Sequence, residues 1–211
     1  RTWFGWRMLW HYFDERRNQT PRLYRSNSAK RLICRLLQRE VCIYGHFNRN
    51  RGFGVEDYYP EIDQFFTFVR DPLTTMLSRY FSGKQLGDRR MRGGKPAPIA
   101  EKYPSLNDFV ADRLERPYFI NYLPGPLTLD NYRDVFKTNF IYVGVMEDLQ
   151  TSVNGLARRL GMPPVAAPHA NSSAHNETLS PELRRAFEQS RSLEYAIYNY
   201  ALEHYRDDPV A

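Results

Sequence analysis

The sequence predicts an α/β domain with a short parallel sheet flanked by helices. Three apolar segments have the length and composition of buried strands, at residues 41–44, 65–69 and 139–145. Helical patterns separate these segments, and strands that alternate with helices are typical of a parallel sheet. With 211 residues, of which 15% are aromatic, the chain is long enough for one domain with a sizeable core.

The chain before the first strand is predicted to be mainly helical. Three tryptophans recur there at helical spacing: Trp3, Trp6 and Trp10. Residues 1–10 are therefore expected to form a helix whose tryptophans face the core. The polar residues 14–30 predict a loop and residues 29–39 a short basic helix. The strand 41–44 is followed by Gly45 and His46, and a loop rich in glycine and charge follows.

The most informative segment runs from Phe65 to Phe81. An apolar run ends at Arg70-Asp71-Pro72, and a helical pattern follows it. Arg70 therefore ends a strand, and Ser78 lies about two turns into the next helix. A guanidinium and a hydroxyl in this arrangement can converge on one anion at the end of a strand, where open α/β sheets bind ligands. The alternative is a strand-end arginine that pairs with Asp71 or another acid.

The middle of the chain alternates between polar segments and short helices. Residues 82–103 are basic and contain glycine and proline, which predicts a long surface loop. Ser105 is expected to cap a helix through residues 109–114, with Asp108 at its third position. Further expected elements are a loop at 118–126 and a helix at 130–136.

The last third of the chain has clear helix boundaries. A helix over residues 149–160 ends at Gly161 and the prolines after it. Residues 166–177 are polar and predict a loop. Ser180 is a suitable cap and Pro181 a suitable first residue for the helices that run to the end.

Composition limits the kinds of partner. The net charge is +6 and the isoelectric point about 9.3, which favours anionic partners or reflects a merely basic soluble protein. Two cysteines make neither a disulfide framework nor a zinc site, so buried free thiols and a reducing compartment are expected. No apolar run reaches 18 residues, so no transmembrane helix is predicted, and no signal peptide is recognised.

The motif of Arg70 and Ser78 resembles that of the PAPS-dependent sulfotransferase family, in which PAPS is 3′-phosphoadenosine-5′-phosphosulfate. In that family a strand-end arginine and a serine with seven residues between them hold the 3′-phosphate of the donor. The segments Tyr44–Phe47 and Phe140–Leu149 look like parts of the carbohydrate-type branch. The resemblance implies a P-loop NTPase-like fold of three layers, over a single sulfotransferase-like domain that spans residues 1–211.

The same family has a 5′-phosphosulfate loop between its first strand and first helix. Arg1, Thr2 and Trp3 resemble the last residues of that loop. The lysine, serine and glycine that precede them in the family have no counterpart here, so the first strand and most of the loop are expected to be truncated. The backbone N–H groups and lysine of such a loop stabilise the oxygen from which the sulfuryl group leaves, so without them this chain is expected to bind the donor poorly and to turn over slowly or not at all.

The resemblance also suggests residues for the acceptor side and the adenine side. His46 is the candidate general base, because an imidazole near neutral pKa suits removal of a hydroxyl proton. Glu56 and Asp57 are the alternatives, since a carboxylate can serve instead. The loop over residues 169–175 resembles the segment that closes over the nucleotide, so Asn171 and Ser172 are expected to contact the donor.

The expected function is transfer of a sulfuryl group from PAPS to a hydroxyl of a carbohydrate or small metabolite, with an anionic glycan among the acceptors. No metal, nucleic acid or membrane segment is expected to take part. The first alternative is a non-catalytic polyanion-binding protein on a degenerate sulfotransferase scaffold, using the basic residues 84–95. The second is a P-loop kinase, which would need a lysine-containing glycine-rich loop and a magnesium-binding aspartate. The expected location is cytoplasmic, or the Golgi lumen if an N-terminal anchor is missing.

Overall fold

The computed structural model describes residues 3–11, 25–45, 47–52, 54–91, 98–167 and 178–205. It has the α/β composition that the sequence predicts, with helices and short parallel sheets. The chain falls into two compact units, each of which is described by itself. Unit 1 comprises residues 1–64 and 118–127, and unit 2 comprises residues 65–117 and 128–211. The expectation of one sulfotransferase-like domain over the whole chain stays a prediction.

The described residues of unit 1 contain a two-stranded parallel sheet and one α-helix. Strand β1 (Met8–His11) pairs with β2 (Cys42–Gly45), with Met8 opposite Cys42. Helix α1 (Arg25–Leu36) lies between these strands in the sequence. The strand predicted at 41–44 is therefore confirmed. Short 3-10 turns complete the unit: η1 (Gly5–Arg7), η3 (Arg49–Arg51), η4 (Val55–Asp57) and η5 (Phe119–Tyr122).

The helix predicted over residues 1–10 is wrong. The described residues form the short turn η1 followed by the strand β1. Gly5 has a φ of 52°, a left-handed conformation that interrupts a right-handed helix. Hydrogen bonds to β2 then hold residues 8–11 extended, an interaction that the local spacing of tryptophans cannot reveal. The indole of Trp6 is 52% exposed, so it does not face a core.

Helix α1 starts earlier than predicted, at Arg25 rather than residue 29. The expected loop at 14–30 is correspondingly shorter, and residues 12–24 lie outside the described part. The thiols of Cys34 and Cys42 are buried and free, as predicted. Burial raises the pKa of the Cys42 thiol, which makes it a poor nucleophile at neutral pH.

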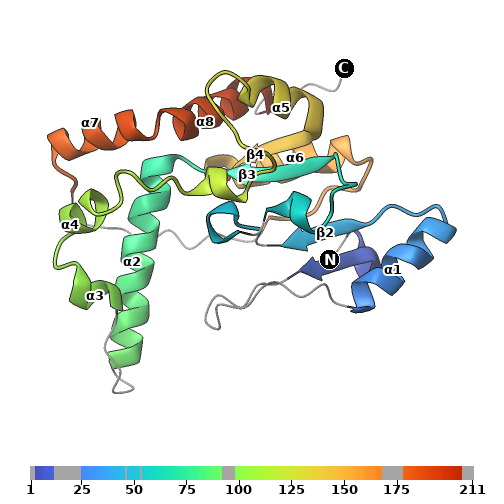
Figure 1. The fold of residues 1–211 in the computed structure, drawn as a ribbon, viewed down its shortest axis with the longest axis horizontal. Coiled ribbons are helices and arrows are strands. Elements are labelled where there is room, and N and C mark those ends of the chain that lie inside the picture. The colour runs from blue at the N-terminus through green and yellow to red at the C-terminus, as the bar shows by residue number, and fades with distance from the viewer. Residues whose placement is uncertain are drawn as a thin grey trace. The chain divides into compact units, whose positions relative to one another are not determined.

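Unit 2 is built on a second parallel pair of strands, β3 (Phe65–Val69) and β4 (Phe140–Val145). Both strands match the predicted segments. Helices α6 (Leu149–Arg159) and α8 (Ser192–Tyr205) pack against β4, and both are drawn beside it in Figure 1. The approach of α6 is very close, because a Cβ on Gly155 would lie 2.3 Å from the Tyr142 hydroxyl. A glycine is therefore required where this helix meets the sheet.

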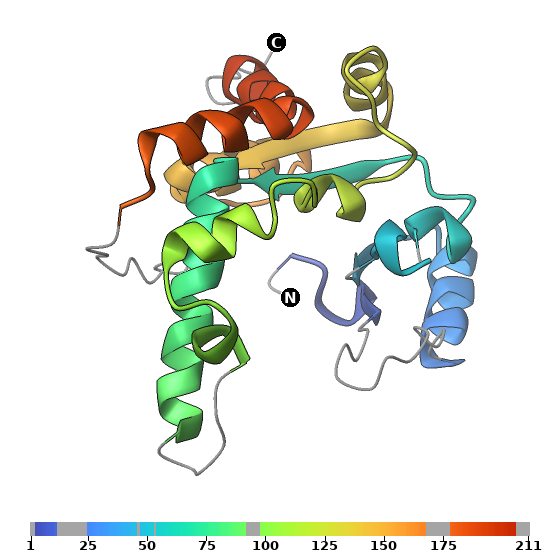
Figure 2. The same ribbon diagram turned by 60° about the vertical axis from the view of Figure 1, so that its left-hand side comes forward.

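The remaining helices of unit 2 enclose an aromatic core. Figure 2 shows α3 (Pro98–Lys102) and α4 (Leu106–Ala111) alongside the long helix α2 (Pro72–Met91). Helix α7 (Pro181–Ser190) packs against α4. Ile99 of α3 is partly buried against this core. The buried residues of the core come from α2, α4, α7 and the positions next to these helices: Leu73, Met76, Tyr80, Phe81, Tyr103, Leu106, Phe109, Val110, Leu179 and Phe187.

The prediction of a long surface loop at 82–103 is wrong over much of that range. Helix α2 continues to Met91. The helix continues through Gly83, where Ile99 of α3 packs so closely that a Cβ on residue 83 would lie 2.2 Å from its terminal methyl group. The ammonium of Lys84 lies 5.0 Å from the centre of the Tyr80 ring, a contact between residues one turn apart in the same helix. The basic residues 89–95 have no described side chains.

The predicted helix caps are confirmed. The Ser105 hydroxyl accepts the N–H of Asp108 at 3.2 Å, and the Asp108 carboxylate accepts the N–H of Ser105 at 3.2 Å. The hydroxyl of Ser180 accepts the N–H of Leu183 at 3.2 Å, with Pro181 in the first position. Helix α4 ends at Ala111 rather than near residue 114, and α5 covers Tyr132–Asn139 rather than 130–136.

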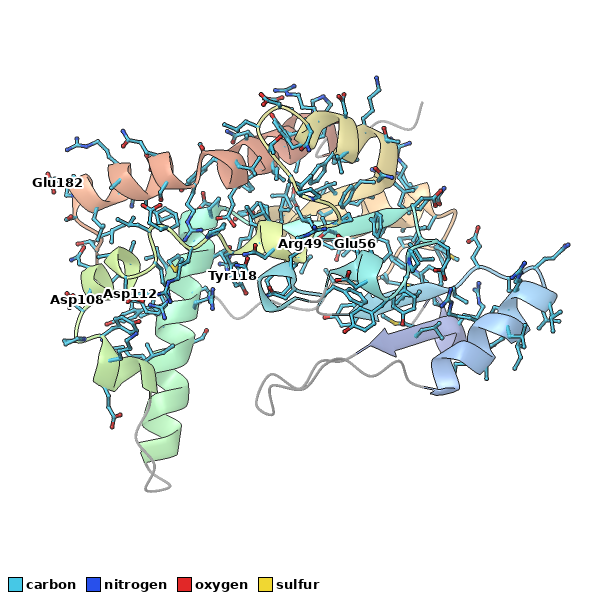
Figure 3. The ribbon with its side chains drawn as sticks, viewed as in Figure 1. Arg49, Glu56, Asp108, Asp112, Tyr118 and Glu182 are labelled. Atoms are coloured by element: carbon cyan, nitrogen blue, oxygen red, sulfur yellow. The ribbon has the colours of Figure 1, made fainter. Side chains whose placement is uncertain are left out.

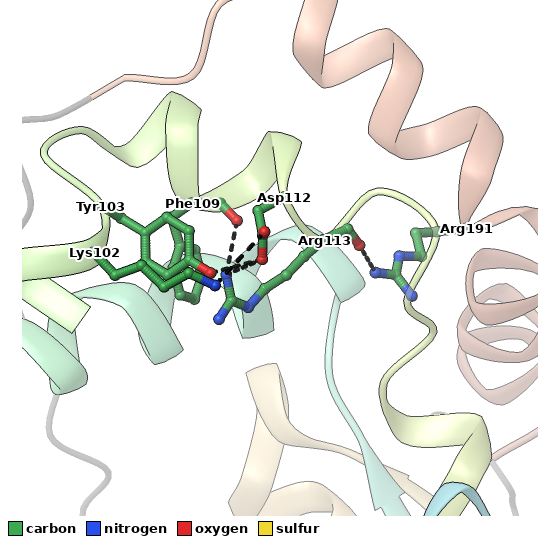
Figure 4. Close-up of polar contacts among 6 residues, drawn as sticks. All are labelled: Lys102, Tyr103, Phe109, Asp112, Arg113 and Arg191. Atoms are coloured by element: carbon green, nitrogen blue, oxygen red, sulfur yellow. Dashed lines mark hydrogen bonds and ion pairs between the residues drawn. The ribbon is translucent and has the colours of Figure 1, made fainter. Parts of the chain in front are cut away.

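A polar cluster fixes the end of α4 (Figure 4). The Tyr103 hydroxyl donates to the Asp112 carboxylate at 2.6 Å, and Lys102 and Arg113 lie beside the same carboxylate. The backbone carbonyl of Arg113 accepts a hydrogen bond from the buried guanidinium of Arg191. Burial lowers the pKa of Arg191, and the carboxylate of Glu194 at 3.6 Å opposes that shift.

Candidate functional site

Arg70 lies at the C-terminal end of β3, in the position that the sequence predicted. It follows Val69 directly and is half-buried. Among the residues that the structure describes, its guanidinium forms no ion pair. The structure therefore does not show the alternative, an ion pair between Arg70 and Asp71. A half-buried guanidinium at a strand end, with no carboxylate partner in the described part, is suited to bind an external anion.

The carboxylate of Asp71 has a different role, as the cap of α2. Its Oδ1 accepts the N–H of Thr74 at 2.6 Å, and its carbonyl accepts the N–H of Thr75 at 2.9 Å. The backbone N–H of Asp71 donates to Glu147 Oε1 at 2.9 Å. Because Glu147 lies two residues after the end of β4, this bond joins the ends of the two paired strands. Sequence reasoning missed it, since the two residues are 76 positions apart.

The capping contacts occupy donors that an anion would otherwise use. A helix N-terminus binds anions through its free backbone N–H groups. In α2, Pro72 has no N–H, and the groups of Thr74 and Thr75 are bonded to Asp71. An anion at this edge must therefore be held by side chains, so Arg70 is its principal donor here.

Ser78 lies on α2, on the side opposite the core. It is half-buried, as are Thr74 and Thr75. At 100° per residue, these hydroxyls and that of the exposed Ser82 fall within an arc of about 100°. The core residues Leu73, Met76 and Tyr80 lie on the other side of the helix. The spacing of hydroxyl residues at three and four positions was present in the sequence, and it would have identified the threonines as further candidates.

Tyr195 of α8 places another hydroxyl at the start of α2. Burial raises the pKa of this hydroxyl, and the carboxylates of Asp71 and Glu188 raise it further. A backbone hydrogen bond from Leu73 and the charge of Arg184 oppose the shift. A tyrosine hydroxyl whose pKa is raised keeps its proton at neutral pH.

The net charge of the residues at the end of β3 is not positive. Arg70 supplies one positive charge, whereas Asp71 and Glu147 supply two negative ones, although each carboxylate accepts a backbone N–H. A phosphate monoester has nearly two negative charges. Strong binding of such a group needs at least one further cation or several N–H donors beyond those described.

The candidates of unit 1 that are described have partners within that unit. Glu56 forms an ion pair with Arg49, and both residues are labelled in Figure 3. Asp57 accepts the N–H of Gly54 at 2.6 Å. Trp3 is half-buried in the turn before η1. The ion pair leaves Glu56 less available as a base than the sequence alone implied.

Several predicted site residues lie outside the described residues: Arg1, Thr2, His46, Asn171 and Ser172. The strand before His46 pairs with β1, whereas the strand before Arg70 pairs with β4. The two strand ends, which were expected to open on one edge, thus belong to separate sheets.

The described residues contain no group of three His, Cys, Asp or Glu side chains that could hold a metal ion. Within the same residues, no helix is both long enough and apolar enough to cross a membrane.

Comparisons of the chain with known protein families, with curated proteins and with solved structures gave no match.

Proposed function

We propose that the chain is a PAPS-dependent sulfotransferase that transfers a sulfuryl group to a hydroxyl of a carbohydrate or small metabolite. The main support is Arg70, a half-buried guanidinium at the end of β3 that forms no ion pair within the described part of the chain. Ser78 on the outer side of α2 is the second contact. The proposed fold is a P-loop NTPase-like domain of three layers, which the parallel pair β3–β4 and its helices are compatible with.

In this mechanism Arg70 and Ser78 bind the 3′-phosphate, the group of the donor that does not react. The acceptor oxygen attacks sulfur, the bond from sulfur to the bridging phosphate oxygen breaks, and 3′-phosphoadenosine 5′-phosphate (PAP) leaves with the electron pair. The proton of the acceptor passes to His46. In-line positioning and charge stabilisation supply most of the rate acceleration in transfers of this type.

We assign the missing positive charge and N–H donors to residues that, apart from Trp3, lie outside the described part. Arg1, Thr2 and Trp3 would contact the 5′-phosphosulfate, and Asn171 and Ser172 the nucleotide. Such contacts are needed because Arg70 alone does not offset the negative charges of Asp71 and Glu147. No metal takes part in this chemistry, and the proposed compartment is the cytoplasm.

Titration calorimetry with PAP tests the proposal. Arg70→Ala is expected to weaken binding about tenfold or more, because a bidentate, charge-assisted contact is lost. Arg70→Lys should also weaken it, since an ammonium keeps the charge and loses the planar fork. Ser78→Ala removes one hydrogen bond and should cost about fivefold.

Arg185→Ala is the matched control, since Arg185 is an exposed arginine of α7 whose ion pair with Glu182 lies at the surface. This variant should bind PAP like the unmodified chain, which excludes a general effect of net charge. Unchanged affinity in Arg70→Ala would contradict the proposal. Binding of heparin without any binding of PAP would favour the polyanion-binding alternative.

The role of His46 is tested separately in the sulfuryl-transfer assay. His46→Ala should lower turnover and leave the affinity for PAP unchanged, because the general base does not contact the 3′-phosphate. Full activity in this variant would transfer the role to Glu56 or Asp57.

A further inference from the structure

Helix α1 presents an apolar surface to solvent. Three of its residues and the residue directly after it are large, apolar and between 47% and 74% exposed: Leu32, Ile33, Leu36 and Leu37. Leu32 and Leu36 are one turn apart, as are Ile33 and Leu37, so the four fall within about 140° of the helix circumference. Large apolar side chains gathered in this way usually mark an interaction surface.

The opposite side of α1 holds the helix to unit 1. The Cys34 thiol is buried there. The guanidinium of Arg31 lies 5.1 Å from the centre of the Tyr59 ring and pairs with Glu61. The exposed apolar surface is therefore not the side on which α1 packs against its own unit.

Basic residues lie on both sides of the apolar surface of α1. Residues 25–39 contain five basic side chains and no acidic one: Arg25, Lys30, Arg31, Arg35 and Arg39. On a helical projection Arg35 falls about 60° before Leu32, and Lys30 about 20° beyond Leu37. An apolar arc with cations at both edges is the pattern of helices that lie in the interface of an anionic membrane.

We propose that α1 docks unit 1 on an anionic membrane surface, with its four apolar side chains in the acyl boundary and Lys30 and Arg35 at the headgroups. At 12 residues the helix is too short to span a bilayer, so it would lie in the plane of the surface. A nucleic acid would bind the basic side chains but would not bury the apolar arc. The inference depends on unit 1 alone and not on the proposed sulfotransferase activity.

Co-sedimentation of the full chain with lipid vesicles tests this inference. The chain is expected to bind vesicles of phosphatidylcholine and phosphatidylserine at roughly 7:3 and to bind pure phosphatidylcholine much more weakly. The double variant Leu32→Gln, Leu36→Gln should lose about tenfold or more in binding to the mixed vesicles. Lys30→Gln with Arg35→Gln should reduce the preference for the anionic vesicles about tenfold.

Leu129→Gln is the matched control, because Leu129 is 55% exposed and belongs to unit 2. It should bind vesicles like the unmodified chain, and circular dichroism should show that every variant is folded. Failure of the unmodified chain to bind the mixed vesicles would overturn the inference. Unchanged vesicle binding by the double leucine variant would also overturn it. So would a change in the oligomeric state of that variant in sedimentation, because the apolar surface would then contact a second copy of the chain.

Discussion

The sheets β1–β2 and β3–β4 are both parallel pairs, and their strands β2 and β4 differ in how far they are buried. Five of the six residues of β4 are buried, and the helices α6 and α8 pack against that strand. In β2 only Cys42 is buried, and Tyr44 is 45% exposed. Parallel sheets normally have both faces covered.

This difference follows from where the helices of each unit direct their apolar residues. Helix α6 places Gly155 and Leu156 in the interior of unit 2. Helix α1 directs its leucines to solvent, and Cys34 is the one buried residue among positions 29–36 of the helix. The same strand pairing therefore gives a closed core in one unit and a partly covered sheet in the other, and the stability of unit 1 should be the lower of the two.

The largest difference in stability is expected when a leucine is replaced by alanine in each unit. Leu106 of α4 is 1% exposed, whereas Leu36 of α1 is 74% exposed. Leu106→Ala should lower the free energy of unfolding by about 3 kcal/mol, through lost burial and the cavity left behind. Leu36→Ala should change it by less than about 0.5 kcal/mol. Urea denaturation followed by circular dichroism measures both, and equal costs would contradict the comparison.

The second prediction concerns the order in which the units unfold. All three tryptophans lie in unit 1, at positions 3, 6 and 10, whereas most of the helical residues lie in unit 2. Tryptophan fluorescence should therefore report unit 1 and far-ultraviolet circular dichroism mainly unit 2. The fluorescence transition is expected at a urea concentration about 1 M lower. Coincident transitions would show instead that the units unfold together.

A smaller effect is expected where α6 meets the sheet. In Gly155→Ala the new methyl group would lie 2.3 Å from the hydroxyl of the buried Tyr142. Overpacking should exceed the gain in helix propensity, for a net cost of about 1–2 kcal/mol.

Gly83→Ala in α2 is the matched control for that prediction. Its new methyl group would meet the terminal methyl of Ile99, which can rotate away. A change of less than about 1 kcal/mol in either direction is expected, because the helix propensity of alanine offsets the contact. If the two variants lost equal stability, the packing of α6 on β4 would be no tighter than that of α3 on α2.

The smallest effect concerns acid stability within unit 2. The hydrogen bond from the Tyr103 hydroxyl lowers the pKa of Asp112, and Lys102, Arg116 and Arg113 lower it further. The resulting stabilisation is present above the ordinary pKa of 3.8 and is lost as the pH falls through the lower value of the folded state.

Tyr103→Phe should therefore raise the pKa of Asp112 towards its ordinary value and reduce the loss of stability in that acidic window. Carboxyl titration by NMR measures the first effect and urea denaturation at several pH values the second. Asp108→Asn is the control, since Asp108 caps α4 without contact to Tyr103 among its described bonds. An unchanged pKa of Asp112 in Tyr103→Phe would contradict the assignment of cause.

The sequence predicted the strands β2, β3 and β4 and the caps at Ser105 and Ser180, because apolar runs and capping residues act over a few positions. It also predicted the place of Arg70 at the end of β3 and of Ser78 on the next helix. It failed where a distant partner decides the outcome. Strand β1 forms only because β2 supplies its hydrogen bonds, and α2 continues past Gly83 because α3 packs against it.

The sequence by itself determined which residues stand at the end of β3, since Arg70, Asp71 and Pro72 define a strand end and a helix start. Only the tertiary structure decided how those residues are used. Asp71 caps α2 and is joined to the end of β4 through Glu147, so Arg70 is left without it as an ion-pair partner. That outcome depends on a contact between residues 76 positions apart, which is set by the pairing of β3 with β4 and not by any local pattern.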